Sequence, residues 1–171
     1  MPLVPFDTLP DSARVWVFAS DPPLDDNAAC RLLGEVDRFL AHWQAHGHPL
    51  DGARDWRYGR FLTIAVDQRT AGASGCSIDG LYRALRALQD ALGTALLAGG
   101  VLYYRGAGGD VTAASRADFA ARAARGEITR DTIVFDLTVG TLGEWRERFE
   151  APASAGWHVR LLPDERTASR P

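Results

Sequence analysis

The chain has 171 residues, of which 46% are hydrophobic and 24% are charged, and its formal net charge is -3. This composition is typical of a soluble globular protein, and the length suits one domain or one domain with a smaller appendage. The small negative charge excludes a strongly basic surface, so neither a nucleic acid nor an anionic membrane is an expected partner.

The basic residues are all of one type, because the chain has 19 arginines and no lysine. A Walker A phosphate loop uses a lysine to reach the terminal phosphates of a nucleotide, and Schiff-base chemistry with pyridoxal phosphate uses a lysine amine. Both chemistries are therefore excluded, and we expect no ATPase activity. No other motif requires a cofactor, so none is expected.

Cys30 and Cys76 are the only cysteines of the chain. Two thiols are too few for a disulfide framework or a cysteine-rich zinc site, which fits a reducing cytoplasm. The N-terminal residues lack a basic region followed by an apolar run and a cleavage site, and no apolar stretch approaches the ~20 residues of a membrane span. We therefore expect a cytoplasmic protein that does not insert into a membrane.

The first half of the chain alternates between segments typical of strands and segments typical of helices. The apolar runs at 15–20 (VWVFAS) and 60–67 (RFLTIAVD) predict strands. Between these runs, apolar residues recur at helical spacing. They predict a helix that has Asp25 or Asp26 as its N-cap and that ends near Gly47.

A second helix is predicted after the Gly- and Ser-rich segment TAGASGCSIDG at 70–80. Four leucines recur on one side of this helix at about 100° per residue, and charged residues occupy the opposite side. We expect the leucine side to face the core. Its members are Leu81, Leu85, Leu88 and Leu92.

The second half begins near Gly99 and Gly100 and is expected to be a smaller strand-helix-strand part. Ser115 with Asp118 resembles a capping box, which opens a short helix that Gly126 closes. The remaining predicted elements are strands at 101–106, 132–139 and 157–162 and a helix within GTLGEWRERFE.

Alternating strands and helices predict an α/β (or α+β) fold, with mainly parallel neighbouring strands in the first half. We expect residues 1–99 to form a βαβα domain that carries the SGCSID helix start. Residues 100–163 would form a smaller α+β part packed on the first, and 164–171 a disordered tail.

Several segments together resemble an uncharacterised bacterial family of small proteins. They are PFDTLPDSARVWVF, HWQAHGHPL, RFLTIAVD, SGCSIDG and WHVRLLP, and they span most of the chain. Members of that family are often labelled "ABC transporter ATPase", which the absence of lysine and the short length contradict. The resemblance implies a shared fold and a recurring SGCSID segment, and it implies no established activity.

A second resemblance covers about residues 101–140. VLYYRGAGGDVTAASRADFAARAARGEITRDTIVF is similar to GYF-like modules, in which a tyrosine-bearing strand, a short helix and a G-x-I-T-x-D-T-x-V segment follow in order. Such modules imply recognition of a peptide or a protein partner through aromatic residues. Here GAGGDV stands where those modules have glycine-proline, so the resemblance does not extend to a groove for proline-rich peptides.

Three of the four histidines crowd into HWQAHGHP. His42 and His46 are four residues apart, so a continuous helix would place both on one face, as a metal pair requires. No glutamate follows in the H-E-x-x-H manner, and we interpret His42, His46 and His48 as polar residues near a helix C-terminus. No metal is expected unless His158 or an aspartate lies beside them.

The environment of Cys76 depends on which serine caps the second helix. If Ser77 is the N-cap, Cys76 takes the N′ position of a hydrophobic staple with Leu81, and the thiol is structural. If Ser74 is the N-cap, Cys76 lies in the first turn beside Asp79, where free amides favour thiolate and can receive an anion. The leucine stripe fits both alternatives.

Comparison with known thiol motifs narrows the chemistry of Cys76. The spacing from Cys76 to Arg83 is C-x6-R, one residue longer than the phosphate-binding motif of cysteine phosphatases. CSID has Asp79 where a C-x-x-C motif has its second cysteine, so only a role of a single thiol remains. Asp67, at the end of a predicted strand, either contacts a ligand or caps the following loop.

Two hypotheses for function are kept. In the first, the helix start binds a small anionic ligand, with Cys76 and Asp79 as catalytic residues. The binding residues would be Ser74, Gly75, Ser77, Arg83 and Asp67. In the second, the protein is a non-enzymatic binding protein that contacts a peptide or protein partner through aromatic residues of the second half, namely Tyr103, Tyr104, Trp145 and Trp157.

Overall fold

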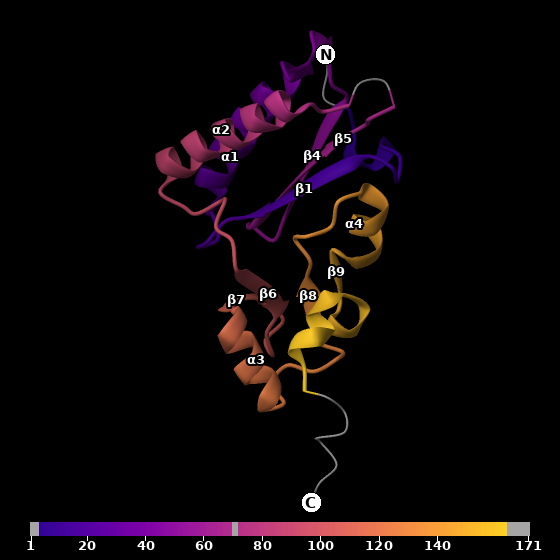
Figure 1. Ribbon diagram of the computed structural model, residues 1–171. Helices are drawn as coiled ribbons and strands as arrows, with labels where there is room; N and C mark the ends of the chain where they lie inside the picture. Colours follow the sequence, from indigo (N-terminus) through magenta and orange to yellow (C-terminus); the bar gives the residue numbers. More distant parts are fainter. Residues whose placement is uncertain (1–3, 70–71, 164–171) are drawn as a thin grey trace, which may run out of the picture. The chain divides into compact units, whose positions relative to one another are not determined.

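The structure, a computed structural model, describes residues 4–69 and 72–163, so the predicted tail at 164–171 lies outside the described residues. The chain forms two compact units, which Figure 1 displays. Unit 1 comprises Met1–Ala98 and Leu137–Arg146, and unit 2 comprises Gly99–Asp136 and Glu147–Pro171. The chain therefore returns to unit 1 after most of unit 2 has been formed.

The sheet of unit 1 has the strand order β1-β5-β4. Its strands are β1 (Arg14–Ala19), β4 (Gly52–Arg57) and β5 (Phe61–Val66), and both neighbouring pairs are antiparallel. The prediction of mainly parallel neighbours is wrong. A tight turn at Tyr58 and Gly59, both with positive φ, joins β4 to β5 and places β5 between β4 and β1.

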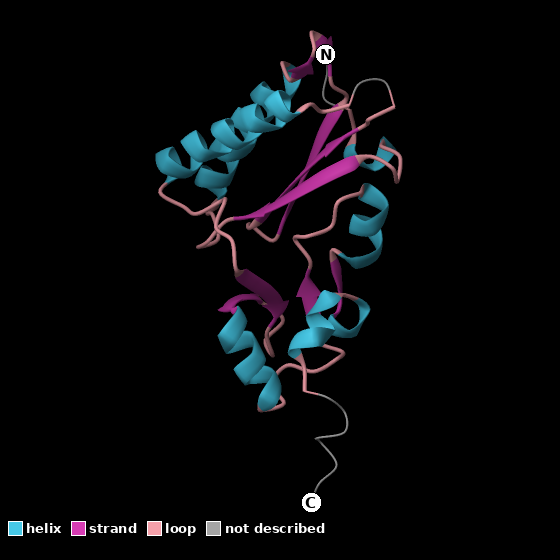
Figure 2. Cartoon of the chain, in the orientation of Figure 1, coloured by secondary structure: helices cyan, strands magenta, loops and turns pink. Residues whose placement is uncertain are grey.

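Two helices of unit 1, α1 (Asp26–Ala41) and α2 (Gly75–Leu92), pack against each other and overlap in the view of Figures 1 and 2. They run antiparallel, since the end of α1 lies beside the start of α2. There Trp43, just after α1, donates its indole N–H to the carbonyl of Ser77 in the first turn of α2. The N-cap of α1 is Asp25, whose carboxylate accepts the amide of Ala28. Both predicted helices of the first half are thus confirmed.

The end predicted for α1 near Gly47 is wrong, because a small hairpin follows the helix. Its strands are β2 (Gln44–Ala45) and β3 (His48–Pro49), joined by His46 and Gly47. Both turn residues have positive φ, as a two-residue hairpin turn requires. His46 therefore does not share a helix face with His42, which is the C-cap of α1.

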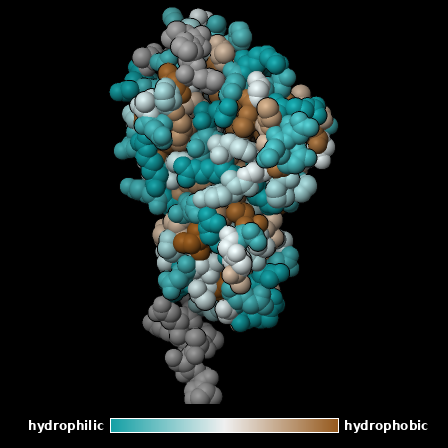
Figure 3. All heavy atoms as spheres, turned by 180° about the vertical axis from the view of Figure 1, so that it is seen from behind, coloured by the Kyte–Doolittle hydropathy of each residue, from teal (hydrophilic) through white to brown (hydrophobic). Residues whose placement is uncertain are grey.

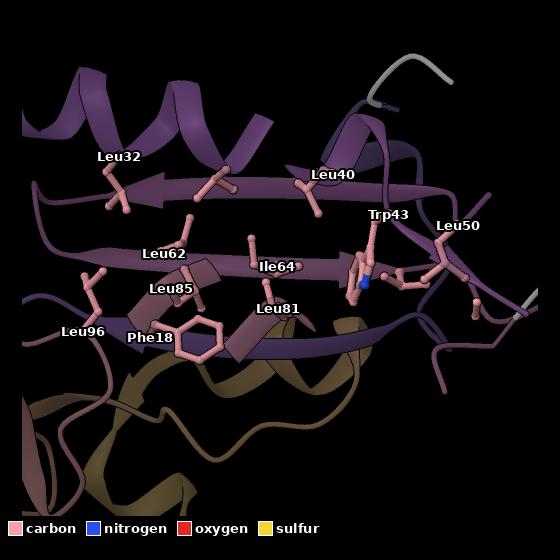
Figure 4. Close-up of a cluster of buried hydrophobic side chains, with 13 residues drawn as sticks. Phe18, Leu32, Leu40, Trp43, Leu50, Leu62, Ile64, Leu81, Leu85 and Leu96 are labelled. Atoms are coloured by element: carbon pink, nitrogen blue, oxygen red, sulfur yellow. The ribbon is translucent and has the colours of Figure 1, made fainter. Parts of the chain in front are cut away.

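The main core of unit 1 lies between the two helices and the sheet. Figure 4 shows leucines of α1 and α2 and alternate residues of β5 pointing into one apolar interior. The prediction for the leucine side of α2 is confirmed for Leu81 and Leu85, which are buried. Leu88 and Leu92 pack against the same core but are only partly buried.

Another part of unit 1 is built around Trp145 in α4 (Leu142–Arg148), which packs edge-on against Phe6 in η1 (Phe6–Thr8). The indole N–H of Trp145 donates to the hydroxyl of Thr63 in β5 at 3.0 Å. Thr63 alternates along β5 with the core residues Leu62 and Ile64, so Trp145 meets the opposite face of the sheet.

The sheet of unit 2 has the order β7-β6-β8-β9, with every neighbouring pair antiparallel. Its strands are β6 (Val101–Arg105), β7 (Val111–Ser115), β8 (Ile133–Phe135) and β9 (Glu150–Pro152). The helix α3 (Arg116–Ala124) begins as predicted, since Ser115 caps it by accepting the amide of Asp118, and Gly126 follows with positive φ.

Two predicted strands of unit 2 are corrected. The strand found within the predicted range 132–139 is shorter than predicted. It is β8, which ends just before the buried Asp136. Residues 157–162 form no strand: the 3-10 helices η2 (Ala153–Ala155) and η3 (Trp157–Leu161) follow β9. The apolar side chains of η3 cover the core of unit 2 instead of pairing in its sheet.

The predicted mixture of helices and strands is confirmed as a mixed α/β fold. None of the helices among the described residues has the length and apolar character needed to cross a membrane. Figure 3, which views the molecule from behind, shows mainly hydrophilic surface with hydrophobic residues in small separate patches.

Candidate functional site

Ser74 is the N-cap of α2. Its hydroxyl accepts the amide of Ser77 at 3.3 Å, and the hydroxyl of Ser77 donates to the carbonyl of Ser74 at 2.8 Å. The helix therefore begins at Gly75, and Cys76 is its second residue. Of the two caps that the sequence allowed, the structure has the one that places Cys76 in the first turn.

The polar residues of this helix start differ in exposure. Cys76, Asp79 and Arg83 are exposed, whereas Ser77 is buried. Cys76 is therefore not the apolar member of a hydrophobic staple. Arg83 lies seven residues after Cys76, which corresponds to roughly 10 Å along the helix axis. The thiol and the guanidinium thus share a helix side without forming one compact group.

Asp67 is anchored within its own loop. Its buried carboxylate accepts hydrogen bonds from the backbone amide and the guanidinium of Arg69, with the shortest at 2.7 Å. These hydrogen bonds lower the pKa of Asp67 below its ordinary value, although burial acts in the opposite direction. The carboxylate thus remains charged at neutral pH and holds the turn after β5, as the loop-capping alternative expected.

The crowded histidines are surface residues of unit 1. His42, His46 and His48 are all exposed, and Nδ1 of His42 lies 2.9 Å from the carbonyl oxygen of Arg38. In the part of the chain that the structure describes, no three histidine, cysteine or acidic side chains are grouped as metal ligands would be.

Tyr103 and Tyr104 of β6 are buried, with 2% and 5% of their surfaces exposed. The ring of Tyr104 packs edge-on against Phe119 of α3 in the core of unit 2. In this conformation neither tyrosine presents its ring to a partner.

The two tryptophans predicted to bind a partner belong to different units. Trp145 is buried in unit 1, where the guanidinium of Arg57 lies 4.3 Å from its ring centroid. Trp157 belongs to unit 2, is half-buried, and stacks on His158 with ring centroids 4.1 Å apart. The four aromatic residues therefore do not form one surface within a single unit.

Helices α1 and α2 border a groove of about 760 Å³ on unit 1, a volume in the range of small-molecule sites. The wall from α2 is wholly apolar, whereas the wall from α1 combines small, aromatic and charged side chains. The lining residues are Asn27, Cys30, Arg31, Gly34, Glu35, Arg38 and Phe39 of α1 and Ala84, Ala87, Leu88, Ala91 and Leu92 of α2. We call this feature the α1/α2 groove.

Gly34 keeps the middle of the α1 wall open. A Cβ atom built on Gly34 would meet no atom within 4 Å, so packing inside the protein does not require glycine there. Glycine in a helix interior costs about 0.5–1 kcal/mol relative to alanine. Gly80 of α2 is equally open but does not line the groove, so the two glycines form a matched pair for substitution.

Sequence reasoning missed the α1/α2 groove because it treated the helices separately. The detectable signal was a second stripe on α2, beside the leucines, formed by Ala84, Ala87 and Ala91 at spacings of three and four residues. Small side chains on the outer flank of a helix leave a depression beside a neighbouring helix. The position of that neighbour depends on tertiary packing, which periodicity alone does not predict.

Unit 2 contains a buried pair of titratable residues, His158 and Asp136, each about 1% exposed. Among the described residues, Nδ1 of His158 has no hydrogen-bond partner. The Asp136 carboxylate accepts the indole N–H of Trp157 at 3.2 Å and lies 3.5 Å from the Arg148 guanidinium. Burial lowers the pKa of His158 below its ordinary value, and the Asp136 charge opposes this shift only in part.

Comparisons of the chain with protein-family models, with curated proteins and with solved structures give no match. The two resemblances noted in the sequence therefore stay expectations.

Proposed function

We propose that this chain is a non-enzymatic binding protein and that the α1/α2 groove is its binding site. The observation that supports this proposal is the groove itself, which is about 760 Å³ in volume and has one fully apolar wall. Burial of apolar surface is the main driving force of most association in water. A groove with this lining therefore favours an occupant that presents apolar side chains.

The proposed function agrees with the second hypothesis from the sequence in being non-enzymatic binding. The binding surface, however, is a different one. Tyr104 and Trp145, expected to contact a partner, are buried within their own units. The α1/α2 groove, by contrast, is formed by the two longest helices of unit 1 and needs no rearrangement to be accessible.

A matched pair of substitutions tests the groove with the neutral apolar dye Nile red. We expect the dye to gain fluorescence with the native protein, and Gly34→Leu to reduce this gain severalfold because the leucine side chain occupies the groove. Gly80→Leu should leave the gain unchanged. Both substitutions replace a helix glycine by a stronger helix former, so both proteins should be at least as stable as the native one.

Equal dye binding by the two leucine variants would contradict a binding site in the groove. Thermal unfolding of both variants checks that a loss of binding does not come from a loss of folding.

A second candidate function concerns the start of α2, where Cys76 is exposed and Ser74 caps the helix. Backbone amides in the first turn of a helix attract anions. We keep the proposal that this segment binds a small anionic group, with a single reactive thiol at Cys76. The exposure of Cys76 at the second helical position supports it.

Alkylation tests this second candidate. We expect iodoacetamide to modify Cys76 faster than Cys30 at pH 7, and phosphate or sulfate to slow the reaction at Cys76. Both cysteines are exposed in the single chain, so Cys30 serves as the internal reference at protein concentrations low enough to leave the α1/α2 groove empty. Faster labelling of Cys30, or rates at Cys76 that do not respond to either anion, would leave the helix start with a structural role only.

A further inference from the structure

We infer that the occupant of the α1/α2 groove is a second copy of this chain, which docks its own α1 in antiparallel orientation. This inference rests on the proposed function, because it names the partner of the same groove. The two copies would be related by a two-fold axis near the middle of α1, so that each copy places the same surface against the other.

The shape of α1 permits such a contact. Groove residues of α1 extend from Asn27 to Phe39, a length of roughly 18 Å along the helix axis. Gly34 lies near the centre of this face and has no side chain, and Cys30, one turn before it, has a small one. Small residues at the centre of a helix face let another helix backbone approach closely. The alanines in the α2 wall continue the apolar surface of the groove beside this face.

The charges of α1 provide the argument for a second copy. Arg31 and Glu35 carry opposite charges, lie four residues apart on the groove side of α1 and are both exposed. When an identical helix runs antiparallel about an axis between residues 31 and 35, each Arg31 lies opposite Glu35 of the other copy. The groove therefore carries its own complementary charges, in a symmetric arrangement that forms two ion pairs at once.

A wholly apolar ligand fits the α1 wall less well than a second copy. The structure shows no hydrogen bond or ion pair for Arg31 among the described residues, and Glu35 pairs only with the exposed Arg38. A wholly apolar ligand would cover these charged side chains without pairing them, which costs free energy. An antiparallel copy supplies a carboxylate to Arg31 and a guanidinium to Glu35.

Sedimentation of the full chain with single and paired charge reversals tests the inference. We expect the native protein to form a dimer reversibly as its concentration rises from about 1 to 100 μM, the range of moderate affinities. Arg31→Glu and Glu35→Arg should each weaken self-association about tenfold or more, because each variant alone brings like charges together twice.

Mixing the two single variants should restore the dimer. A heterodimer of Arg31→Glu with Glu35→Arg contains two attractive pairs across the interface, whereas each homodimer contains two repulsive ones. Effects confined to one helix cannot produce this recovery, since neither chain changes on mixing. Gly34→Leu should also weaken the dimer, and Gly80→Leu should not.

The outcomes separate the inference from the proposed function. A monomer at every concentration, or a dimer that responds to neither charge reversal, would overturn the inference of a second copy. If Nile red still binds the native monomer and not Gly34→Leu, the groove remains a binding site and its occupant is a small apolar ligand. If Gly34→Leu affects neither dye binding nor association, both proposals fail.

Discussion

Replacing Leu85 by alanine should lower the free energy of unfolding by about 2–5 kcal/mol. Leu85 is about 1% exposed and lies in the core cluster between α1, α2 and β5 (Figure 4). The substitution removes apolar surface from this core and leaves a cavity that the surrounding side chains fill only in part. Chemical denaturation followed by circular dichroism measures the change.

Leu88→Ala is the matched control for Leu85→Ala. Leu88 is only partly buried and lines the α1/α2 groove, so its truncation should cost less than half as much. A loss below about 0.5 kcal/mol for Leu85→Ala would mean that α2 faces the core with a different side.

A second effect on stability is expected from protonation of the buried His158 in unit 2. Burial lowers the pKa of His158 in the folded protein, so as pH falls below about 6.5 the unfolded chain binds a proton before the folded one does. Stability is therefore complete above about pH 6.5 and decreases until pH reaches the folded pKa. The total loss is about 1.4 kcal/mol for each unit between the two pKa values.

Burial, rather than the charged groups near His158, fixes the sign of this effect. Asp136 favours the protonated imidazole, but its carboxylate is shared with Trp157 and Arg148, and burial has the larger influence. Arg116 lies 5.8 Å from the centre of the Trp157 ring, on which His158 stacks. Burial therefore sets the direction of the pKa shift of His158, and the Asp136 charge reduces its size.

Unfolding measured at pH 7 and at pH 5 tests the expectation for His158. His158→Phe, which keeps an aromatic ring beside Phe119 and Trp157, should lose part of the pH dependence. His48→Gln, at an exposed position, should keep all of it. An identical pH dependence in the native protein and in His158→Phe would contradict the assignment.

The sequence predicted those helices and strands whose hydrophobic pattern lies within one continuous segment. The apolar run at 60–67 became β5, which is buried on both faces, and the leucine period became α2. β4 was missed because half of its residues, GARDWR, are charged and four of the six are only half-buried. Without β4 in view, the sequence could not indicate that β5 has antiparallel neighbours.

The contacts of Trp145 depend on pairing between distant segments. Its indole meets Thr63 and Phe6, which precede it in the chain by 82 and 139 residues. No local pattern distinguishes a tryptophan that packs on a distant sheet from one that lies in the neighbouring module. For the same reason, the sequence did not predict that residues 137–146 return to unit 1.

The N-cap of the helix start at Cys76 could not be predicted for a different reason. Ser74 and Ser77 are both good N-caps, and the leucine stripe begins after both, so the sequence left two alternatives. The structure has Ser74 as the cap, while Ser77 is buried and accepts the Trp43 indole N–H through its carbonyl. That tertiary contact, from the end of α1, lies 34 residues away along the chain.

The rate of alkylation at Cys30, measured beside the rate at Cys76, tests most directly whether the α1/α2 groove holds an occupant. Cys30 lines the groove, whereas Cys76 is exposed outside it. When Nile red saturates the protein, iodoacetamide should modify Cys30 severalfold more slowly and Cys76 at its original rate. An unchanged rate at Cys30, or equal slowing at both cysteines, would contradict binding in the groove.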